Sequence, residues 1–472
     1  MEWTEFGEWA HRIADWTRDY RETVGDLPVR AQVRPGQILA ALPVTPPEGP
    51  EAMDRIFADF EDIVMPGITH WQHPRFFAYF AANAAAPSVL AEFLVSAIAP
   101  NCLIWQTSPA GTEMETRVMD WLRQAIALPE GFSGVIQDSA STATLAAVLT
   151  MRERALDFTG NSGGLFGRVP LRVYCSAEVH TSIDRAIWIS GIGSENLVRV
   201  PNAGANRGMD PQALRALIAR DRAAGLAPAG IILCVGATGV GATDPVDEIM
   251  QIAAEEGLYT HVDAAWSGSA MICPEFRPMW AGVERADSIV FNPHKWLGAN
   301  FDCSAHFVRA PEDLVRTLAI RPEYLKTHGA DGIINYSEWS VPLGRRFRAL
   351  KLWFLIRSYG LDGLRQVLRN HIAWTAALHD RLAAEPDFEI VTPPMWSLFS
   401  FRYVPAGADD LDALNQRLVD AINDDGRIYL TQTRVDGALV IRFQAGSFET
   451  TEADVMMALD VIREIAHGLT KG

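Results

Sequence analysis

Hydrophobic residues follow three different patterns along this chain of 472 residues. In the first region they recur at the spacing of an amphipathic helix: Phe6, Trp9, Ala10, Ile13, Trp16 and Tyr20. A proline-rich, extended stretch from Pro28 to Pro50 is expected next, followed by a second helix around 51–63. Because this region cannot form a core alone, we expect it to pack against a larger body, across the interface of a dimer.

The second region alternates between short apolar runs and helical patterns. The runs predict strands at Gly134–Gln137, Leu171–Ser176, Gly230–Gly236, Leu258–Asp263 and Ser288–Phe291, and the helices between them include Ser141–Leu156 and Pro245–Glu256. These strands are short, apolar and not alternating, which is typical of a parallel sheet covered by helices on both faces.

A third pattern begins after a long helix that is expected near 345–370. It predicts strands at Phe388–Thr392, Ser397–Tyr403 and Ala438–Phe443, with helices near 409–424 and 450–468. We therefore expect an N-terminal segment (1–84), a large α/β domain (85–380) and a small C-terminal α+β domain (381–472).

Charge, hydropathy and cysteine spacing disfavour several classes of protein. The net charge of −17 and the sequence pI of about 5.1 disfavour nucleic acid and anionic membranes as partners. The acidic N-terminus lacks the pattern of a signal peptide, and no uncharged apolar run reaches the length of about 18 residues that a membrane span needs. The five cysteines are scattered without a CxxC pair, which favours a reduced cytoplasmic protein without a zinc site.

The candidate chemistry centres on a lysine and an aspartate. Lys295 follows the predicted strand Ser288–Phe291, and Asp263 ends an earlier strand. A lysine amine can form a Schiff base with the aldehyde of pyridoxal 5′-phosphate (PLP), and a carboxylate can keep the pyridine nitrogen of PLP protonated. A carboxylate at the end of a buried strand is costly unless it is paired. Because parallel α/β sheets bind ligands at the carboxyl ends of their strands, the pattern predicts a PLP site there.

Other polar residues also follow predicted strands. The run Gln137–Thr144 is rich in small and hydroxylated residues and opens a helix, so it could cradle a phosphate or simply cap the helix. His180 could stack on an aromatic cofactor or be an ordinary loop histidine. His261 and Asp263 match two ligands of a 2-His-1-carboxylate iron site, but that interpretation leaves Lys295 without a role, and we expect no metal.

A series of motifs runs nearly from end to end of the chain. They are Met65–Trp71, His73–Phe80, Trp105–Pro109, Val135–Gln137, His261–Ala265, Ile272–Arg277, Asn292–Trp296, Asn300–Ser304 and Pro342–Phe347. On these motifs the chain resembles the PLP-dependent group II amino-acid decarboxylases, and in particular the aromatic-L-amino-acid decarboxylases. The resemblance implies the type I aminotransferase fold, assembled as a homodimer with shared active sites.

The resemblance also implies roles for individual residues. The catalytic residues would be Lys295, Asp263, His180 and Tyr336. PLP would contact Ala140, Ser141, His180, Thr238, Asp263, Ala265, Asn292, His294 and Lys295. The aromatic substrate would contact Trp71, Tyr79, Phe80, Ala81, Ala82, Asn101, Leu103, Thr238 and Gly344.

The implied reaction is decarboxylation of aromatic L-amino acids to aryl amines and carbon dioxide, with aromatic acetaldehyde synthesis on the same scaffold as the alternative. Tyr336 matches a tyrosine that donates a proton from a mobile loop, and the polar stretch Thr327–Asp331 would belong to that lid. Aldehyde synthases have replaced either this tyrosine or the ring-stacking histidine, and both are present here. Ala81, Ala82 and Trp266 depart from the family pattern near the substrate, so the preferred side chain stays open.

Overall fold

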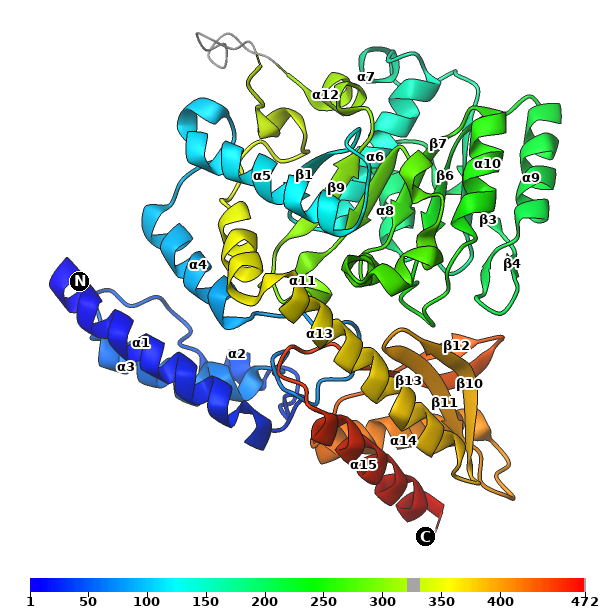
Figure 1. Ribbon diagram of the computed structural model, residues 1–472. Helices are drawn as coiled ribbons and strands as arrows, with labels where there is room; N and C mark the ends of the chain where they lie inside the picture. Colours follow the sequence, from blue (N-terminus) through cyan, green and yellow to red (C-terminus); the bar gives the residue numbers. More distant parts are fainter. Residues whose placement is uncertain (321–331, 471–472) are drawn as a thin grey trace. The chain divides into compact units, whose positions relative to one another are not determined.

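The chain folds into two compact units (Figure 1), and the computed structural model describes residues 1–320 and 332–470. The large unit is Ala82–Arg369, and the terminal unit combines Met1–Ala81 with Asn370–Gly472. The sequence predicts the N-terminal segment and the C-terminal domain as separate parts, whereas in the structure they share one unit. The reason is a common core, because Phe77 packs among the buried apolar residues of the C-terminal strands and helices.

The large unit is built on a seven-stranded sheet with the order β1-β9-β8-β7-β6-β2-β3. Its strands are β1 (Ser133–Gln137), β9 (Ser304–Val308), β8 (Ser288–Phe291), β7 (Tyr259–Asp263), β6 (Ala227–Cys234), β2 (Leu171–Ser176) and β3 (Leu197–Val200). β9 runs antiparallel to both of its neighbours, and the other strands run parallel to one another. The predicted α/β class with a mostly parallel sheet is confirmed.

Helices cover both faces of this sheet (Figure 1). α6 (Ala140–Ala155) and α8 (Ser182–Ile189) belong to connections that advance toward the β3 edge, whereas α9 (Pro211–Ala223) and α10 (Val246–Glu256) belong to connections that return toward β1. Because parallel crossovers are right-handed, connections that advance in opposite directions lie on opposite faces. The unit also contains α4 (Ala86–Ile98), α5 (Pro109–Ala125), α7 (Gly160–Gly163), α11 (Pro293–Trp296), α12 (Pro311–Leu318) and the short hairpin of β4 (Asn202–Ala203) and β5 (Gly208–Met209).

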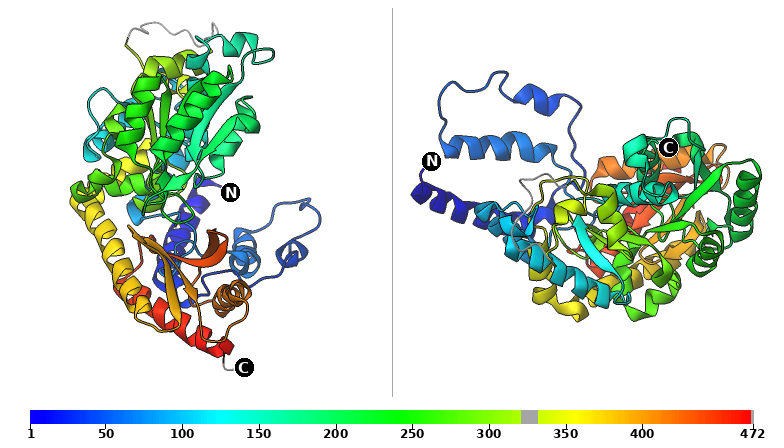
Figure 2. Two further views of the ribbon diagram at one scale, coloured as in Figure 1. Left: turned by 90° about the vertical axis from the view of Figure 1, so that its right-hand side faces the viewer. Right: turned by 90° about the horizontal axis from the view of Figure 1, so that it is seen from above.

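The terminal unit holds a four-stranded antiparallel sheet with the order β10-β11-β13-β12 (Figure 2). Its strands are β10 (Phe388–Met395), β11 (Leu398–Tyr403), β13 (Ala438–Gln444) and β12 (Thr431–Val435), and its helices are α1 (Trp3–Thr23), α2 (Gln37–Ala41), α3 (Met53–Asp59), α14 (Leu411–Asp425) and α15 (Glu452–Thr470). α14 and α15 supply much of the core that covers this sheet. α1 follows the predicted amphipathic pattern and packs on α3 through Trp9 and Phe57, whose ring centroids are 5.5 Å apart.

The helical segment α13 (Ala349–Ala383) begins in the large unit and ends in the terminal unit. Gly360 interrupts it with a φ of 65° and a ψ of 168°, so the segment is two helices joined at a bend. A side chain at this position would be strained, because positive φ is disfavoured for residues with a Cβ. Within the described ranges, the structure contains no helix that has both the length and the apolar character needed to cross a membrane.

Candidate active site

The carboxyl ends of the parallel strands meet at one edge of the large-unit sheet. Asp263 ends β7 and pairs with Cys234 of β6 on one side and Val290 of β8 on the other. The segment that carries Lys295 follows β8, and His180 follows β2. The predicted lysine, aspartate and histidine therefore emerge at the same edge, where open α/β sheets bind their ligands.

A chain of hydrogen bonds fixes the spacing between Asp263 and Lys295. The Ala265 N–H donates to Asp263 Oδ1 at 3.0 Å, and the Asn292 N–H donates to the Ala265 carbonyl at 2.8 Å. The Lys295 N–H donates in turn to the Asn292 carbonyl at 2.9 Å. Asn83 holds the other side, because its side-chain amide donates to the Lys295 carbonyl.

Burial destabilises both charges of this pair. It lowers the pKa of Lys295, and the Asp263 carboxylate opposes that shift. It raises the pKa of Asp263, against the opposing effects of the Lys295 ammonium, the Ala265 N–H and His180. A lysine with a lowered pKa is more often the neutral amine that attacks an aldehyde, and a buried carboxylate suits a cationic partner such as a protonated pyridine.

His180 presents a neutral imidazole at the same edge. Its Nδ1 accepts the Ser182 N–H at 3.1 Å and lies 2.9 Å from the Ser182 hydroxyl. Because Nδ1 is an acceptor here, the ring proton of the neutral form is on Nε2. Burial of the ring lowers the pKa of His180, although Asp263 opposes this effect. The residue is nonetheless exposed in the chain, so its ring is open to a ligand.

The first turn of α6 supplies an anion cradle. The Ser139 hydroxyl accepts the Thr142 N–H at 3.2 Å and caps the helix. Within the described part of the chain, the N–H groups of Ala140 and Ser141 have no hydrogen-bond acceptor. Ala140 packs with Ala265 in one cluster, so the side chains beside the helix end are small. Free N–H groups at a helix N-terminus favour a phosphate.

These observations fit PLP. Lys295 would bond to it, Asp263 would pair with its pyridine nitrogen, and Ala140 and Ser141 would hold its phosphate. When bound, PLP supplies an electron-withdrawing ring that stabilises the electron pair left on Cα of an amino acid. Asn292 is oriented by the Ser304 hydroxyl, which donates to its Oδ1, and Thr238 is half-buried in the loop after β6.

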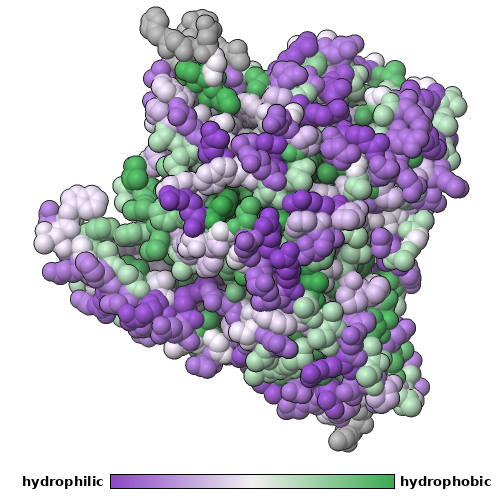
Figure 3. Space-filling model, in the orientation of Figure 1, coloured by the Kyte–Doolittle hydropathy of each residue, from purple (hydrophilic) through white to green (hydrophobic). Residues whose placement is uncertain are grey.

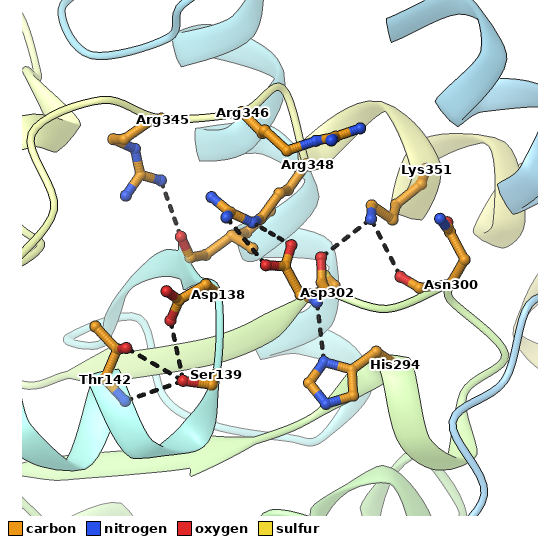
Figure 4. A network of polar contacts seen from close by, with 12 residues as sticks. Asp138, Ser139, Thr142, His294, Asn300, Asp302, Arg345, Arg346, Arg348 and Lys351 are labelled. Atoms are coloured by element: carbon orange, nitrogen blue, oxygen red, sulfur yellow. Dashed lines mark hydrogen bonds and ion pairs between the residues drawn. The ribbon is translucent and has the colours of Figure 1, made fainter. Parts of the chain in front are cut away.

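His294 is tied into the wall of the site. Its Nδ1 accepts the Cys303 N–H at 2.9 Å, and burial lowers its pKa to about 3. Figure 4 shows the cations that fix the neighbouring loop. Arg348 binds both carboxylate oxygens of Asp302, at 2.8 and 3.3 Å, and Lys351 donates to the carbonyls of Asn300 and Asp302. The 300–304 motif is recognisable in the sequence, but the cations that hold it are not, because Arg348 and Lys351 lie far from it along the chain.

The predicted substrate residues are divided between the two units. In the large unit, Asn101 Oδ1 accepts the Arg345 N–H at 3.1 Å, and the Leu103 carbonyl accepts the Ser337 N–H at 2.9 Å. Arg345 also binds the buried Glu115 and the Ile136 carbonyl, so it anchors Gly344 and Asn101 beside β1. Sequence reasoning missed the role of Arg345, because nothing in the motif Pro342–Phe347 reveals its distant partner Glu115.

The remaining aromatic candidates belong to the terminal unit. The rings of Trp71 and Tyr79 stack with centroids 5.8 Å apart, and both are exposed in this chain. Phe80 and Ala81 are buried, and the guanidinium of Arg442 lies 5.6 Å from the centroid of the Phe80 ring. Ala82 begins the large unit.

The structure places Tyr336 inside the large unit, in a buried cluster beside β1. The Tyr336 residue is only 2% exposed and packs with Val135 and Trp339. Its hydroxyl lies 3.0 Å from the Thr116 hydroxyl and 3.4 Å from the carbonyl of Gly134, near the amino end of β1. Burial raises the pKa of this phenol above its ordinary value. The predicted lid stretch Thr327–Asp331 lies outside the described residues.

His261, the other histidine weighed as a ligand, is committed to the interior. Its ring nitrogens lie 3.1 Å from the Thr144 hydroxyl and 2.8 Å from the Ser288 hydroxyl. Burial lowers the pKa of His261 to about 3, so the ring is neutral. Among the described residues, no three His, Cys, Asp or Glu side chains are arranged to hold a metal ion.

The fold and this edge define a PLP-binding enzyme with the type I aminotransferase fold. The family model described as the pyridoxal-dependent decarboxylase conserved domain matches residues 35–404, and the chain belongs to this family.

Individual relatives cover the whole chain. It is 38% identical over 477 residues to the phenylacetaldehyde synthase of Arabidopsis thaliana, covering 99% of this chain and 96% of that protein. It is also 38% identical over 485 residues to the aromatic-L-amino-acid decarboxylase of Rattus norvegicus, with coverage of 100% and 99%. The crystal structure of Oryza sativa TDC with PLP and tryptamine superposes with a TM-score of 0.96 at 34% identity, covering 99% of both chains.

Lys295 is expected to be the lysine that bonds covalently to PLP, because of the two lysines in the described residues it is the one whose ammonium interacts with Asp263 at the strand ends. Borohydride reduction of the PLP-loaded protein, followed by peptide mapping, should find the pyridoxyl group on Lys295 and none on a Lys295→Ala variant. Lys351 serves as an internal control, because it is buried and its ammonium is 2.8 Å from Glu92. A label on Lys351 in place of Lys295 would contradict the assignment.

Proposed function

We propose that this protein decarboxylates aromatic L-amino acids to the corresponding aryl amines and carbon dioxide. The observation that carries the proposal is the meeting of Lys295, Asp263 and the neutral His180 at one edge of the sheet. The names of the relatives support an aromatic substrate, since they include an aromatic-L-amino-acid decarboxylase and a phenylacetaldehyde synthase. Loss of carbon dioxide is common to the amine-forming reaction and to its aldehyde-forming alternative.

The residues of the edge have distinct tasks in this proposal. Lys295 would hold the cofactor covalently through its side-chain amine. Asp263 would keep the pyridine nitrogen protonated, for which its carboxylate must be ionised beside a cation. Ser182 binds His180 at Nδ1, which leaves the Nε2–H of His180 available to donate to the substrate carboxylate. Holding that carboxylate perpendicular to the cofactor ring decides which bond of Cα breaks.

A substrate panel tests the reaction. The PLP-loaded enzyme, given phenylalanine, tyrosine, tryptophan and dihydroxyphenylalanine, should release amine and carbon dioxide in equal amounts from at least one of them, without hydrogen peroxide. Glutamate serves as the non-aromatic control and should give no product. Equal amounts of aldehyde and hydrogen peroxide would establish the alternative, and turnover of glutamate alone would overturn the aromatic assignment.

A pair of tyrosine variants tests the proton donor. Tyr336→Phe should lower thermal stability and leave amine as the product, because the Tyr336 hydroxyl is bonded inside the core. Tyr324, in the segment 321–331 outside the described residues, is the tyrosine nearest to Tyr336 in the sequence and is substituted in the same way for comparison. If Tyr324→Phe instead shifts the product toward aldehyde, ammonia and hydrogen peroxide, slow protonation of Cα has let dioxygen compete. The same shift in a folded Tyr336→Phe enzyme would restore Tyr336 as the donor.

We also propose a homodimer with shared active sites. α4 keeps Leu90, Phe93, Leu94 and Ile98 exposed, and Figure 3 shows this apolar surface on the large unit. Exposed apolar patches of this kind mark interfaces. The predicted substrate residues Asn101 and Leu103 come directly after α4, so a second copy that covers the helix would also approach them.

Mixed dimers test the sharing of sites. Lys295→Ala and Leu103→Arg, each inactive alone, should together recover about a quarter of the wild-type activity when coexpressed equally, because half of the dimers are mixed and hold one intact site. Lys295→Ala with His180→Ala is the control and should recover none, since both residues belong to the same edge of one chain. The absence of recovery in the first pair, or full activity of a monomer in light scattering, would contradict the shared site.

A further inference from the structure

A buried chain of polar side chains crosses the large-unit sheet beneath the cofactor edge. The Thr144 hydroxyl lies 3.1 Å from His261 Nε2, and His261 Nδ1 lies 2.8 Å from the Ser288 hydroxyl. The same hydroxyl lies 2.8 Å from His306 Nε2. All of these side chains are fully buried, and none has a part in the reaction proposed above. Such a chain in a sheet interior is costly unless its members are satisfied, so it calls for a role.

These buried hydrogen bonds join α6 and β7, the two elements that would hold the two ends of PLP. Thr144 lies one helical turn after Ala140 in α6, so both residues are on the same face of the helix, below the phosphate cradle. His261 lies two residues before Asp263 in β7, so both side chains are on the same face of the strand, below the carboxylate. The contact between Thr144 and His261 therefore connects the helix and the strand directly beneath the two cofactor contacts.

The direction of each hydrogen bond follows from His306, the last side chain in this series. His306 Nδ1 has no hydrogen-bond partner within the described residues and is buried. A buried N–H without an acceptor is rarer than a buried lone pair without a donor, so the ring hydrogen of His306 belongs on Nε2 and is donated to Ser288. Ser288 then donates its single hydrogen to His261 Nδ1, and His261 donates from Nε2 to Thr144. Burial lowers the pKa of both histidines to about 3, so both rings are neutral.

We propose that Thr144 and His261 are positioning residues that set the distance between the phosphate cradle on α6 and the Asp263 carboxylate on β7. The proposal rests on PLP as the cofactor but not on the identity of the substrate. PLP gains its affinity from being held at both ends at once, in the way that two linked binding groups gain from a matched span. If the distance between the α6 cradle and Asp263 changes, the cradle can still bind phosphate and the Asp263 end can still bind pyridoxal. Intact PLP, which must reach both ends at once, should then bind poorly.

Thr144→Val tests the proposal, because valine keeps the shape of threonine and removes only its hydroxyl. Thr150→Val is the matched control: Thr150 is also buried in α6, but its hydroxyl bonds to the carbonyl of Ala146 in its own helix at 2.9 Å. Thr144→Ser keeps the hydroxyl and serves as the conservative rescue. The readouts are the dissociation constants of the apoprotein for PLP, for pyridoxal and for inorganic phosphate, with the melting temperature of each apoprotein.

Thr144→Val should bind PLP roughly tenfold more weakly, because the His261 N–H loses its acceptor and α6 shifts relative to β7. Its dissociation constants for pyridoxal and for inorganic phosphate should match those of the wild type, and Thr144→Ser and Thr150→Val should bind PLP normally. Unchanged PLP affinity in Thr144→Val would overturn the proposal. So would an equal loss of PLP affinity in Thr150→Val, or a loss of pyridoxal affinity as large as that of PLP. Since no readout is turnover, failure of the proposed aromatic substrate would leave these results unaffected.

Discussion

The site depends on one electrostatic constraint: the buried charges of Lys295 and Asp263 each stabilise the other. Burial disfavours the ionised form of each residue, and each opposes that effect on the other. Two such residues are useful only at a fixed separation, yet 31 positions of chain lie between Asp263 and Lys295. The hydrogen bonds through Ala265 and Asn292 replace that long path by a short one, so the sheet edge and the loop after β8 move as one piece.

The need for fixed distances around the site also explains which loops the charged residues of the large unit bind. Arg348 and Lys351 lie near the start of α13, and both bind the loop that holds His294 in place. Arg345 and Glu115 form a buried pair that ties Gly344 and Asn101 to β1. A buried pair of this kind is weak support for stability but specifies one arrangement, because either charge alone would be strongly disfavoured. These cations fix loops, whereas the backbone N–H groups of α6 are left to receive an anionic cofactor.

The sequence predicts which polar residues follow the strands, because strand ends are marked by residue type, but it does not predict long-range contacts. β2 and β8 have the bounds that the sequence predicts for their mostly apolar runs. β9 and β12 were not predicted, since Ser304 and His306 interrupt the apolar run of one and Thr431–Val435 is largely polar. The pairing of the N-terminal segment with the C-terminal core, and the burial of Tyr336 against Thr116, depend on partners far away in the sequence. A motif can identify a tyrosine but cannot show whether its hydroxyl faces a ligand or the core.

The histidines of the large unit show how position in the fold decides function for one residue type. A backbone N–H can only donate, so the Ser182 N–H at His180 and the Cys303 N–H at His294 place the ring hydrogen of each neutral imidazole on Nε2 without further assumption. In both cases the donor is supplied by the backbone and does not depend on pH. His294 is 3% exposed, so its N–H faces the protein interior, whereas the His180 ring is open at the strand ends. Burial lowers the pKa of His180, His261, His294 and His306, and among these four rings the one at the edge of the sheet, His180, is exposed.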